Sequence, residues 1–305
     1  MVTNKKKILV LMGGKSRERL ISIQSGQACF NAIKNMGYKT FKFDPISQIE
    51  KNIKKINPDV VFNCLHGKFG EDGEVQKVLE KLKIPYTHSG IKSSQNAMDK
   101  LKSKKIFLKN NIKTPNYKLI KKISDLDKKI SRCKFIIKPV NEGSSLGVEI
   151  FEKISQSNIK KIKKLLNKFR ILIQEPYIEG KEIQTAVLGN KAIGSVQIIP
   201  KRKFYDYKAK YLSSAKTIHV IPPKITKKLH LKIMKIALKA HKVLKCKGVT
   251  RSDFRINNKG LIYILETNTQ PGMTKLSLVP EIAMNYGMNF KQLVSWMIKD
   301  ASIKR

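Results

Sequence analysis

The stretch that most limits how this chain can fold is residues 249–276, VTRSDFRINNKGLIYILETNTQPGMTKL. Two runs rich in β-branched and aromatic residues flank the turn sequence NNKG, and this pattern predicts a β-hairpin. Side chains alternate between faces along a strand, so Arg251 and Asp253 share one face. By the same rule, Glu266 and Asn268 share one face of the returning strand.

The acids of this hairpin predict a metal site. Folding about the turn places Asp253 nearly opposite Glu266 on the paired strands, with Asn268 on the same surface. Two carboxylates this close repel each other unless a cation lies between them. Hard oxygen ligands of this kind suit Mg²⁺, which also takes substrate phosphates as ligands. A solvated hairpin edge is the alternative, but the apolar run at 261–265 indicates a buried strand, where inward carboxylates need partners.

The length and composition indicate a globular protein of two or three domains. The chain has 305 residues, of which 41% are hydrophobic, which is enough for a sizeable core. No apolar run approaches the ~20 residues of a membrane helix. The apolar stretch at 8–12 is shorter than the core of a signal peptide, so we expect a cytoplasmic protein with no membrane partner. The four cysteines form no CxxC pair, which indicates reduced thiols rather than disulfides or a zinc site.

The net charge of +41 arises from 63 lysines and arginines against 22 acids. Such a balance raises nucleic acid as a partner. The lysines are spread over nearly every predicted helix, however, and lack the interleaved aromatic residues that stack on bases. We therefore favour a solvated, lysine-coated surface and expect no specific nucleic-acid partner, with a basic nucleic-acid-binding protein as the alternative. The positive field should still attract anionic small molecules.

Strands and helices alternate through the first third of the chain. Apolar strand patterns and amphipathic helix patterns lie in turn at 6–12, 22–36, 38–43, 59–64 and 72–82. This order predicts a parallel βαβ sheet with helices on both faces, an α/β arrangement. The loops Gly13-Gly14 and His66-Gly67 follow strand ends, where ligands bind in such sheets.

The rest of the chain predicts α+β units. Helices are expected at 93–110 and 225–245 and twice within 278–300, and strands at 171–175, 183–189 and 192–199. We divide the chain into domains at 1–92, 93–178 and 179–305. Residues 200–218 are polar and rich in lysine and tyrosine, and we interpret this long loop as a lid.

A nucleotide-binding region is predicted around residues 142–147, EGSSLG, which follow a strand that ends at Lys138. Glycines let backbone N–H groups approach an anion closely and serine hydroxyls add donors, so Lys138 and Ser145 are candidate phosphate ligands. Farther along, Glu175 and Glu182 flank the end of an apolar strand and are candidate acceptors for a nucleotide. A solvated strand end explains these two acids about equally well.

Six motifs together resemble the D-alanine–D-alanine ligase family of the ATP-grasp superfamily. They are GGKSRER at 13–19, LHGKFGEDG at 65–73, MDK at 98–100, EGSSLG at 142–147, YDYKAKY at 205–211 and ETNTQPGMT at 266–274. The motifs occur in the family's order and spacing from residue 9 to about 280. The resemblance implies an N-terminal parallel domain followed by two α+β ATP-grasp domains that clamp ATP and Mg²⁺ between them.

The resemblance implies ATP-dependent ligation of two D-alanine molecules for peptidoglycan precursors. The carboxylate of the first D-alanine attacks the γ-phosphate and gives D-alanyl phosphate. The amine of the second D-alanine then attacks the carbonyl, and ADP and phosphate are released. The groups that would neutralise the triphosphate are lysines and two ions of Mg²⁺ or Mn²⁺ on oxygen ligands: Lys100, Lys138 and Lys210, with Asp253, Glu266 and Asn268.

The resemblance also carries over substrate residues. Arg251 and the backbone N–H of Gly272 are the implied donors to the tetrahedral oxyanion. Glu18 matches the residue that binds the ammonium of the first D-alanine, and Ser277 the residue that binds the carboxylate of the second. The family places His66 near the first D-alanine as an orienting or acid–base group, and a structural role in its loop is an equal alternative.

The lid has implied partners and an implied selectivity. Ser144 and Tyr211 correspond to residues that link with Glu18 when the lid closes and excludes water. A lid with Lys210-Tyr211 is associated in this family with D-alanine as second substrate, so D-serine or D-lactate ligation by another ATP-grasp carboxylate–amine ligase is the alternative. The family is commonly dimeric, and a homodimer is expected. The chain departs from common family residues, with an expected effect on affinity only, at Pro176, Gln270, Lys275 and Leu276.

Overall fold

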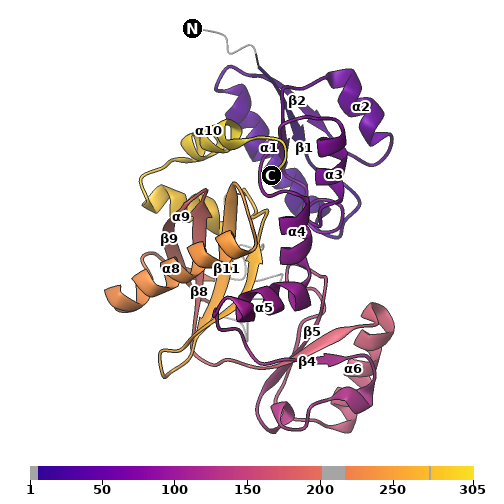
Figure 1. The fold of residues 1–305 in the computed structure, drawn as a ribbon, viewed down its shortest axis with the longest axis vertical. Coiled ribbons are helices and arrows are strands. Elements are labelled where there is room, and N and C mark those ends of the chain that lie inside the picture. The colour runs from indigo at the N-terminus through magenta and orange to yellow at the C-terminus, as the bar shows by residue number, and fades with distance from the viewer. Residues whose placement is uncertain (1–5, 201–216, 275) are drawn as a thin grey trace.

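Three β-sheets organise the protein, for which a computed structural model describes residues 6–200, 217–274 and 276–305 (Figure 1). The N-terminal sheet is parallel, in the order β2-β1-β3, which confirms the predicted βαβ arrangement. Its strands are β1 (Lys7–Leu11), β2 (Lys39–Phe43) and β3 (Val60–Asn63), and its helices are α1 (Arg19–Lys34), α2 (Ile49–Ile56) and α3 (Glu74–Lys81). Helix α2 was not predicted, because its only buried residue is Ile53.

Strand β1 is buried on both faces, as predicted. Ile8 and Val10 pack in one cluster with residues of α1, whereas Leu9 and Leu11 pack in another with residues of α2 and α3. All four side chains are fully buried. A parallel strand of this kind reads as a continuous apolar run because helices cover both of its faces.

The single helix expected at 93–110 is wrong, because the chain forms two helices, α4 (Ile91–Met98) and α5 (Lys100–Lys109). Asp99 adopts an extended conformation between them, and its side chain accepts hydrogen bonds from the backbone N–H groups of Leu101 and Lys102 at 3.0 Å. A carboxylate that satisfies free N–H groups in this way starts a new helix. The break places Lys100 in the first turn of α5.

The second sheet is antiparallel, with strand order β4-β7-β5-β6. Its strands are β4 (Lys118–Ile120), β5 (Phe135–Pro139), β6 (Glu149–Phe151) and β7 (Leu172–Pro176). Two short 3₁₀ turns (Ile123–Asp125 and Ile130–Arg132) and helix α6 (Gln156–Phe169) complete this unit. One small core, which includes Phe135 and Leu172 of the sheet and Ile162 of α6, holds the helix against the sheet.

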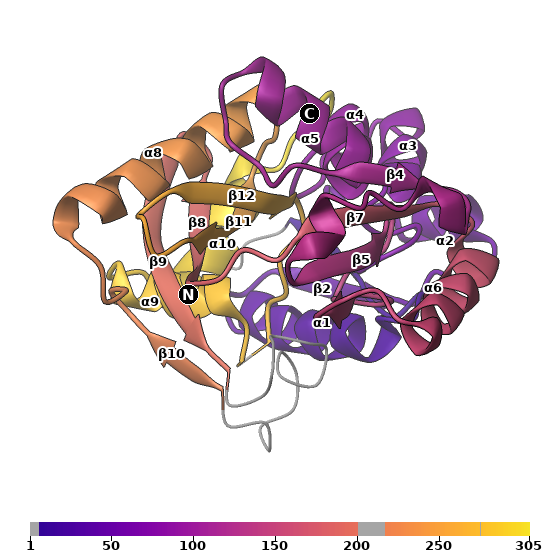
Figure 2. The ribbon, with the colours of Figure 1, turned by 90° about the horizontal axis from the view of Figure 1, so that it is seen from below.

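The third sheet is also antiparallel, in the order β10-β9-β8-β11-β12, and helix α8 (Lys227–Val243) packs on it. Its strands are β8 (Lys181–Leu188), β9 (Lys191–Ile199), β10 (Ile218–Val220), β11 (Val249–Ile256) and β12 (Ile262–Asn268). The predicted turn at 188–191 joins β8 to β9, with Leu188 paired to Lys191. Figure 2 shows β12 of this sheet beside β7 of the second sheet.

The two predicted C-terminal helices are α9 (Leu278–Asn285) and α10 (Phe290–Asp300), and Figure 1 shows α10 beside α1. Val279 and Val294 share one core cluster with Ile8 and Phe62 of the parallel sheet. The N-terminal and C-terminal parts of the chain are therefore joined by a common core, while the domain limits at 92/93 and 178/179 stay predictions. No helix within the described ranges is both long and apolar enough to span a bilayer.

Candidate active site

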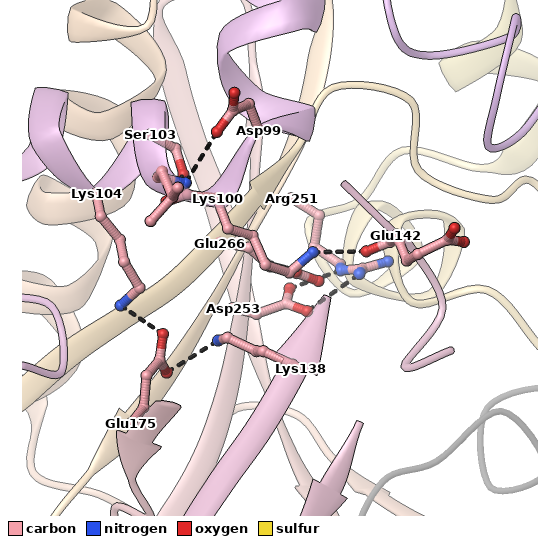
Figure 3. Close-up of polar contacts among 11 residues, drawn as sticks. Asp99, Lys100, Ser103, Lys104, Lys138, Glu142, Glu175, Arg251, Asp253 and Glu266 are labelled. Carbon is pink, nitrogen blue, oxygen red and sulfur yellow. Dashed lines mark hydrogen bonds and ion pairs between the residues drawn. The ribbon is translucent and has the colours of Figure 1, made fainter. Parts of the chain in front are cut away.

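The hairpin of β11 and β12 has the predicted register. Asp253 pairs with Glu266, and Arg251 pairs with Asn268. A β-bulge follows Asp253, where the register of the two strands shifts. Arg251 Nε donates to Asp253 Oδ1 at 2.8 Å and its Nη2 to Oδ2 at 3.1 Å, so the guanidinium chelates the carboxylate (Figure 3). The four side chains singled out from the sequence thus occupy neighbouring positions on the hairpin.

The donor chemistry of the hairpin fits a divalent cation that arrives with phosphates. Asp253 and Glu266 supply two carboxylates and Asn268 an amide oxygen, and Mg²⁺ takes few protein ligands in addition to substrate phosphates. Lys100 Nζ lies 3.7 Å from Glu266 Oε2, so protein cations lie beside both acids. Across the described ranges there is no group of three or more His, Cys, Asp or Glu side chains that could hold a metal ion by itself.

A pocket between the second and third sheets is suited to a nucleotide. Apolar side chains from both sheets line it, together with Lys138, Ser145, Glu182 and Glu266. Pro176, Ile136, Ile150, Leu265 and Val148 provide apolar walls. A lining of both charged and apolar side chains suits the phosphates and the base of a nucleotide.

Arg255 is a pocket residue that sequence reasoning missed. Its guanidinium donates to Glu182 Oε2 at 3.1 Å, to the Ile178 carbonyl at 2.9 Å and to the Tyr177 hydroxyl at 2.9 Å. Glu182, a predicted acceptor, is therefore held in place by an arginine two positions after Asp253 on the same face of β11. The two-residue spacing between Asp253 and Arg255 in a predicted strand was the sequence signal that could have identified Arg255.

Glu175 lines the same pocket, but two lysines hold its carboxylate (Figure 3). Lys104 Nζ lies 2.9 Å from Oε1 and Lys138 Nζ 2.9 Å from Oε2. Burial alone would raise the pKa of this carboxyl, but Lys138 and Lys104 together hold the pKa below its ordinary value. Direct contact of the carboxylate with a nucleotide stays a prediction. The sequence analysis did not single out Lys104. Its position four residues after Lys100, on the same face of a predicted helix, was the signal that could have identified it.

The glycine-rich loop lies where the nucleotide pocket meets a second pocket. The loop carbonyl of Glu142 accepts a hydrogen bond from Lys100 Nζ at 2.5 Å. Ser144 and Ser145 have φ values of 47° and 61°, so both adopt the left-handed conformation. Ser144 donates a hydrogen bond to Glu18 Oε1. The loop is thus linked both to helix α5 and to the N-terminal part of the protein.

The second pocket is rich in acids. Its lining includes Glu18, His66, Ser144, Arg251 and Gly272, which are all predicted site residues. The structure adds Glu71, which lines the same pocket and accepts a hydrogen bond from Gly67 N at 3.0 Å. Burial, followed by the charge of Glu18, raises the pKa of Glu71 to about 8. Glu71 lies in a motif that the sequence singled out, but its burial beside Glu18 was not visible there.

His66 lies in this pocket as a neutral imidazole. Burial lowers its pKa to about 4, and the positive charge of Arg251 acts in the same direction. Within the described part of the chain, its Nε2 has no hydrogen-bond partner. An imidazole with this pKa is uncharged near neutral pH, so it favours an orienting role over proton donation.

Gly272 and Ser277 lie against each other. A Cβ atom at Gly272 would come 2.8 Å from Ser277 Oγ, so a side chain here would displace the Ser277 hydroxyl. Ser277 Oγ accepts a hydrogen bond from Thr274 N at 2.9 Å. The remaining predicted residues, Lys210 and Tyr211, lie outside the described residues, as does most of the expected lid.

Gln270, one of the departures from the family, joins the hairpin to the parallel sheet. Its side chain is 1% exposed, accepts a hydrogen bond from Asn63 Nδ2 at 2.7 Å and donates to the carbonyl of Leu65. Both partners lie at the carboxyl end of β3, next to His66. A residue expected only to tune affinity therefore sets the position of one pocket wall relative to the other.

Comparison with known families gives a match over most of the chain. A family model described as D-ala D-ala ligase N-terminus matches residues 39–89, and one described as D-ala D-ala ligase C-terminus matches residues 106–299. A D-alanine–D-alanine ligase of Pelagibacter ubique is 51% identical over 306 residues, which cover 98% of this chain and 99% of the relative. D-alanine–D-alanine ligase B of Brucella suis is 42% identical, over 98% of this chain and 99% of that one.

Solved structures agree in architecture. A D-alanine–D-alanine ligase from Bacillus anthracis has a TM-score of 0.85 at 32% identity, over 97% of both chains. The same enzyme complexed with ATP has a TM-score of 0.83 at 29% identity over 97% of both chains. A D-Ala:D-Ser ligase from Enterococcus faecalis has a TM-score of 0.82 at 26% identity, over 97% of this chain and 99% of that one. The fold is the expected α+β ATP-grasp architecture, and the chain belongs to the D-alanine–D-alanine ligase family.

Proposed function

We propose that this chain uses ATP to join two D-alanine molecules into D-alanyl-D-alanine, a peptidoglycan precursor. The observation that carries the proposal is a pair of adjoining pockets that share Lys100, Glu142 and Glu266. One pocket combines apolar walls with Lys138 and Arg255, and the other contains the buried acids Glu18 and Glu71. A nucleotide in the first and an amino acid in the second would bring a terminal phosphate toward the amino acid's carboxylate, which holds the reacting groups together.

The nucleotide end of the cleft would bind ATP through its lysines. Lys138 and Lys100 lie where the phosphates would enter, and Ser145 of the glycine-rich loop would add a donor. Glu182, fixed by Arg255, would accept hydrogen bonds from the ribose. Preorganised cations of this kind stabilise the charge that develops as a phosphoryl group is transferred.

We infer that Asp253, Glu266 and Asn268 hold Mg²⁺ or Mn²⁺ when ATP is bound. The ion would neutralise phosphate charge and polarise the transferring group. Arg251 donates one hydrogen bond to each oxygen of Asp253, so the metal would use the remaining lone pairs of this carboxylate. Arg251 already lines the second pocket, where it would donate to the oxyanion of the reacting carbonyl, with the backbone N–H of Gly272.

The acidic end of the cleft would hold the first D-alanine. Glu18 is 5% exposed and would pair with the substrate ammonium, while Ser144 holds the carboxylate of Glu18 in place. His66 would orient the same substrate as a neutral group. Ser277, next to Gly272, would position the carboxylate of the second D-alanine. Lys210 and Tyr211 keep their proposed lid roles, in which Tyr211 links with Glu18 and Ser144 and the closed lid protects the acyl phosphate from water.

The test is product formation with matched substrates. Purified protein is given ATP and Mg²⁺ with D-alanine alone, or with D-alanine plus D-serine or D-lactate, and ADP release and the ligated product are measured. We expect D-alanyl-D-alanine as the main product, and loss of turnover when a chelator removes the metal. Absence of ADP release with D-alanine would remove the proposed function, and a dominant mixed product would favour the alternative second substrate. A retardation assay with DNA and RNA across salt concentrations separates this enzyme from a nucleic-acid-binding protein.

We also propose a cytoplasmic homodimer. Large apolar side chains are exposed on α1 and at the end of α9, where Leu20 is 68% exposed, Met284 59% and Tyr286 42%. Single exposed apolar side chains are ordinary, so the proposal depends mainly on the resemblance to a commonly dimeric family. Light scattering of the purified protein tests this proposal, and a monomer at all concentrations would contradict it.

A further inference from the structure

Lys104 is a buried charge that the proposed reaction does not use. It lies on α5 four residues after Lys100, so both side chains project from the same face of the helix. Its side chain is 0% exposed. Lysine is among the residues least often found fully buried, and when buried it needs partners. The partners of this buried ammonium indicate its role beside the nucleotide pocket.

The ammonium of Lys104 is held by three oxygens. It lies 2.9 Å from Glu175 Oε1, donates to Thr114 Oγ1 at 2.7 Å and donates to the Pro115 carbonyl at 3.2 Å. The contacts with Thr114 and Pro115 are hydrogen bonds, and the contact with Glu175 is an ion pair. Pro115 and Glu175 both line the nucleotide pocket. Lys104 therefore holds two residues of the pocket wall in place from their buried side.

The second oxygen of Glu175 lies 2.9 Å from Lys138 Nζ, which completes a buried Lys104–Glu175–Lys138 cluster (Figure 3). Lys104 Nζ is buried, whereas Lys138 lines the nucleotide pocket. Two positive charges share one negative charge, so the cluster keeps one net positive charge when both lysines are protonated. Because the charge of Lys104 offsets that of Glu175, the charge of Lys138 remains available to the pocket.

We propose that Lys104 is a positioning residue for nucleotide binding: it orients and neutralises Glu175, and so leaves the charge of Lys138 to the phosphates of ATP. The proposal rests on the assignment of this pocket to ATP. Without Lys104, Glu175 and Lys138 form a neutral pair, and the cluster no longer contributes a net positive charge to the pocket. Burial lowers the pKa of Lys104 to about 8, and Glu175 opposes that shift, so the ammonium remains charged near neutral pH.

A purely structural role for Lys104 makes a different prediction. In that case its removal would lower the free energy of unfolding, and the losses in ATP affinity would be small or would follow the loss of folded protein. A role through Glu175 predicts instead a specific loss in ATP binding that depends on the charge at position 175. The two are separated by a double-mutant cycle, which measures coupling between residues in contact.

The experiment compares wild type, Lys104→Met, Glu175→Gln and the Lys104→Met/Glu175→Gln double variant, with Lys105→Met as the matched control. Lys105 follows Lys104 on the same helix and is exposed. ATP affinity is measured by titration calorimetry, and KM for ATP, KM for D-alanine and kcat by ADP release. In Lys104→Met we expect ATP binding weaker by about tenfold, as expected for loss of one buried charge, with KM for D-alanine within about twofold of wild type.

The cycle decides the outcome even where Lys104→Met folds poorly. If Lys104 acts through Glu175, the double variant should bind ATP with an affinity within about twofold of that of Glu175→Gln. In both variants position 175 carries no negative charge that could neutralise Lys138. Equal losses in the presence and absence of the Glu175 charge would overturn the inference, as would unchanged ATP affinity in a folded Lys104→Met. Failure of wild type to ligate D-alanine would count against the proposed function alone, since calorimetry still reports ATP binding.

Discussion

Two buried glutamates, one at each end of the cleft, are held in opposite electrostatic surroundings. At the nucleotide end, Glu175 is 1% exposed and lies between two lysines, which hold its pKa below the ordinary value despite burial. At the substrate end, Glu71 is 8% exposed, and burial and the neighbouring Glu18 raise its pKa to about 8. The same side chain is therefore an anion at one end and largely protonated at neutral pH at the other.

The difference matches the two ligands that we propose. At the nucleotide end, Lys138 and Lys100 are available to phosphates, whereas Glu18 and Glu71 at the other end attract an ammonium. Two acids that crowd together until one takes up a proton are poised to accept a cation, which would restore the second charge. The overall charge of +41 does not produce this separation, because the acidic end persists inside a strongly basic protein.

The largest effect is expected from the hairpin between the two ends. Arg251→Ala or Glu266→Gln, each made alone, should lower kcat by about 10²–10³-fold, since each removes a preorganised charge at the reacting centre. Circular dichroism and thermal unfolding should remain close to wild type. Near-normal turnover in either folded variant would remove that residue from the proposed chemistry.

A smaller effect, confined to one end, is expected from Glu18→Gln. KM for D-alanine should rise by about 10–100-fold because a charge-assisted contact with the ammonium is lost, while KM for ATP changes little. The same substitution should lower the pKa of Glu71, because the charge of Glu18 is one cause of its elevation. Carboxyl NMR of the labelled protein measures that pKa, and an unchanged value would show that the two acids are not coupled.

Gln270→Ala tests whether the hydrogen bonds of Gln270 hold the hairpin against the parallel sheet. The substitution removes one of the two hydrogen bonds donated by Asn63 Nδ2 and leaves the carbonyl of Leu65 without the side-chain donor seen here, and should lower the free energy of unfolding by about 1–3 kcal/mol. Chemical denaturation measures this loss, and Gln24→Ala on the exposed face of α1 is the control. Equal stability of the two variants would show that the bridge contributes little.

The smallest expected effect concerns the pH dependence of stability, and it involves a buried histidine outside both pockets. Burial lowers the pKa of His88, which lies between α3 and α4, to about 3. A histidine with a depressed folded-state pKa binds its proton more readily when unfolded, so its contribution to stability is present above pH ~6.5 and is lost as pH falls toward 3. His88→Asn should therefore reduce the pH dependence of the free energy of unfolding in that window, by at most ~1.4 kcal/mol per pH unit. An unchanged slope would contradict this sign.

Much of the site could be predicted because its signals are local in sequence. Arg251, Asp253, Glu266 and Asn268 meet because strand alternation and a four-residue turn fix their faces and register. The parallel sheet followed from apolar runs that alternate with helical patterns. The missed break at Asp99 was also local, but a capping side chain inside a continuous helical pattern gives only a weak signal.

The sequence by itself determined which residues form the hairpin and the strand-end loops, because periodicity and turn chemistry act over a few residues. Only the tertiary structure decided the state of the charged groups. Lys104 meets Glu175 across two elements, Gln270 reaches Asn63 over 207 positions, and His66 and Glu71 acquire their pKa values from burial. Charge–charge energies and desolvation depend on distance in space, and a linear pattern does not contain those distances.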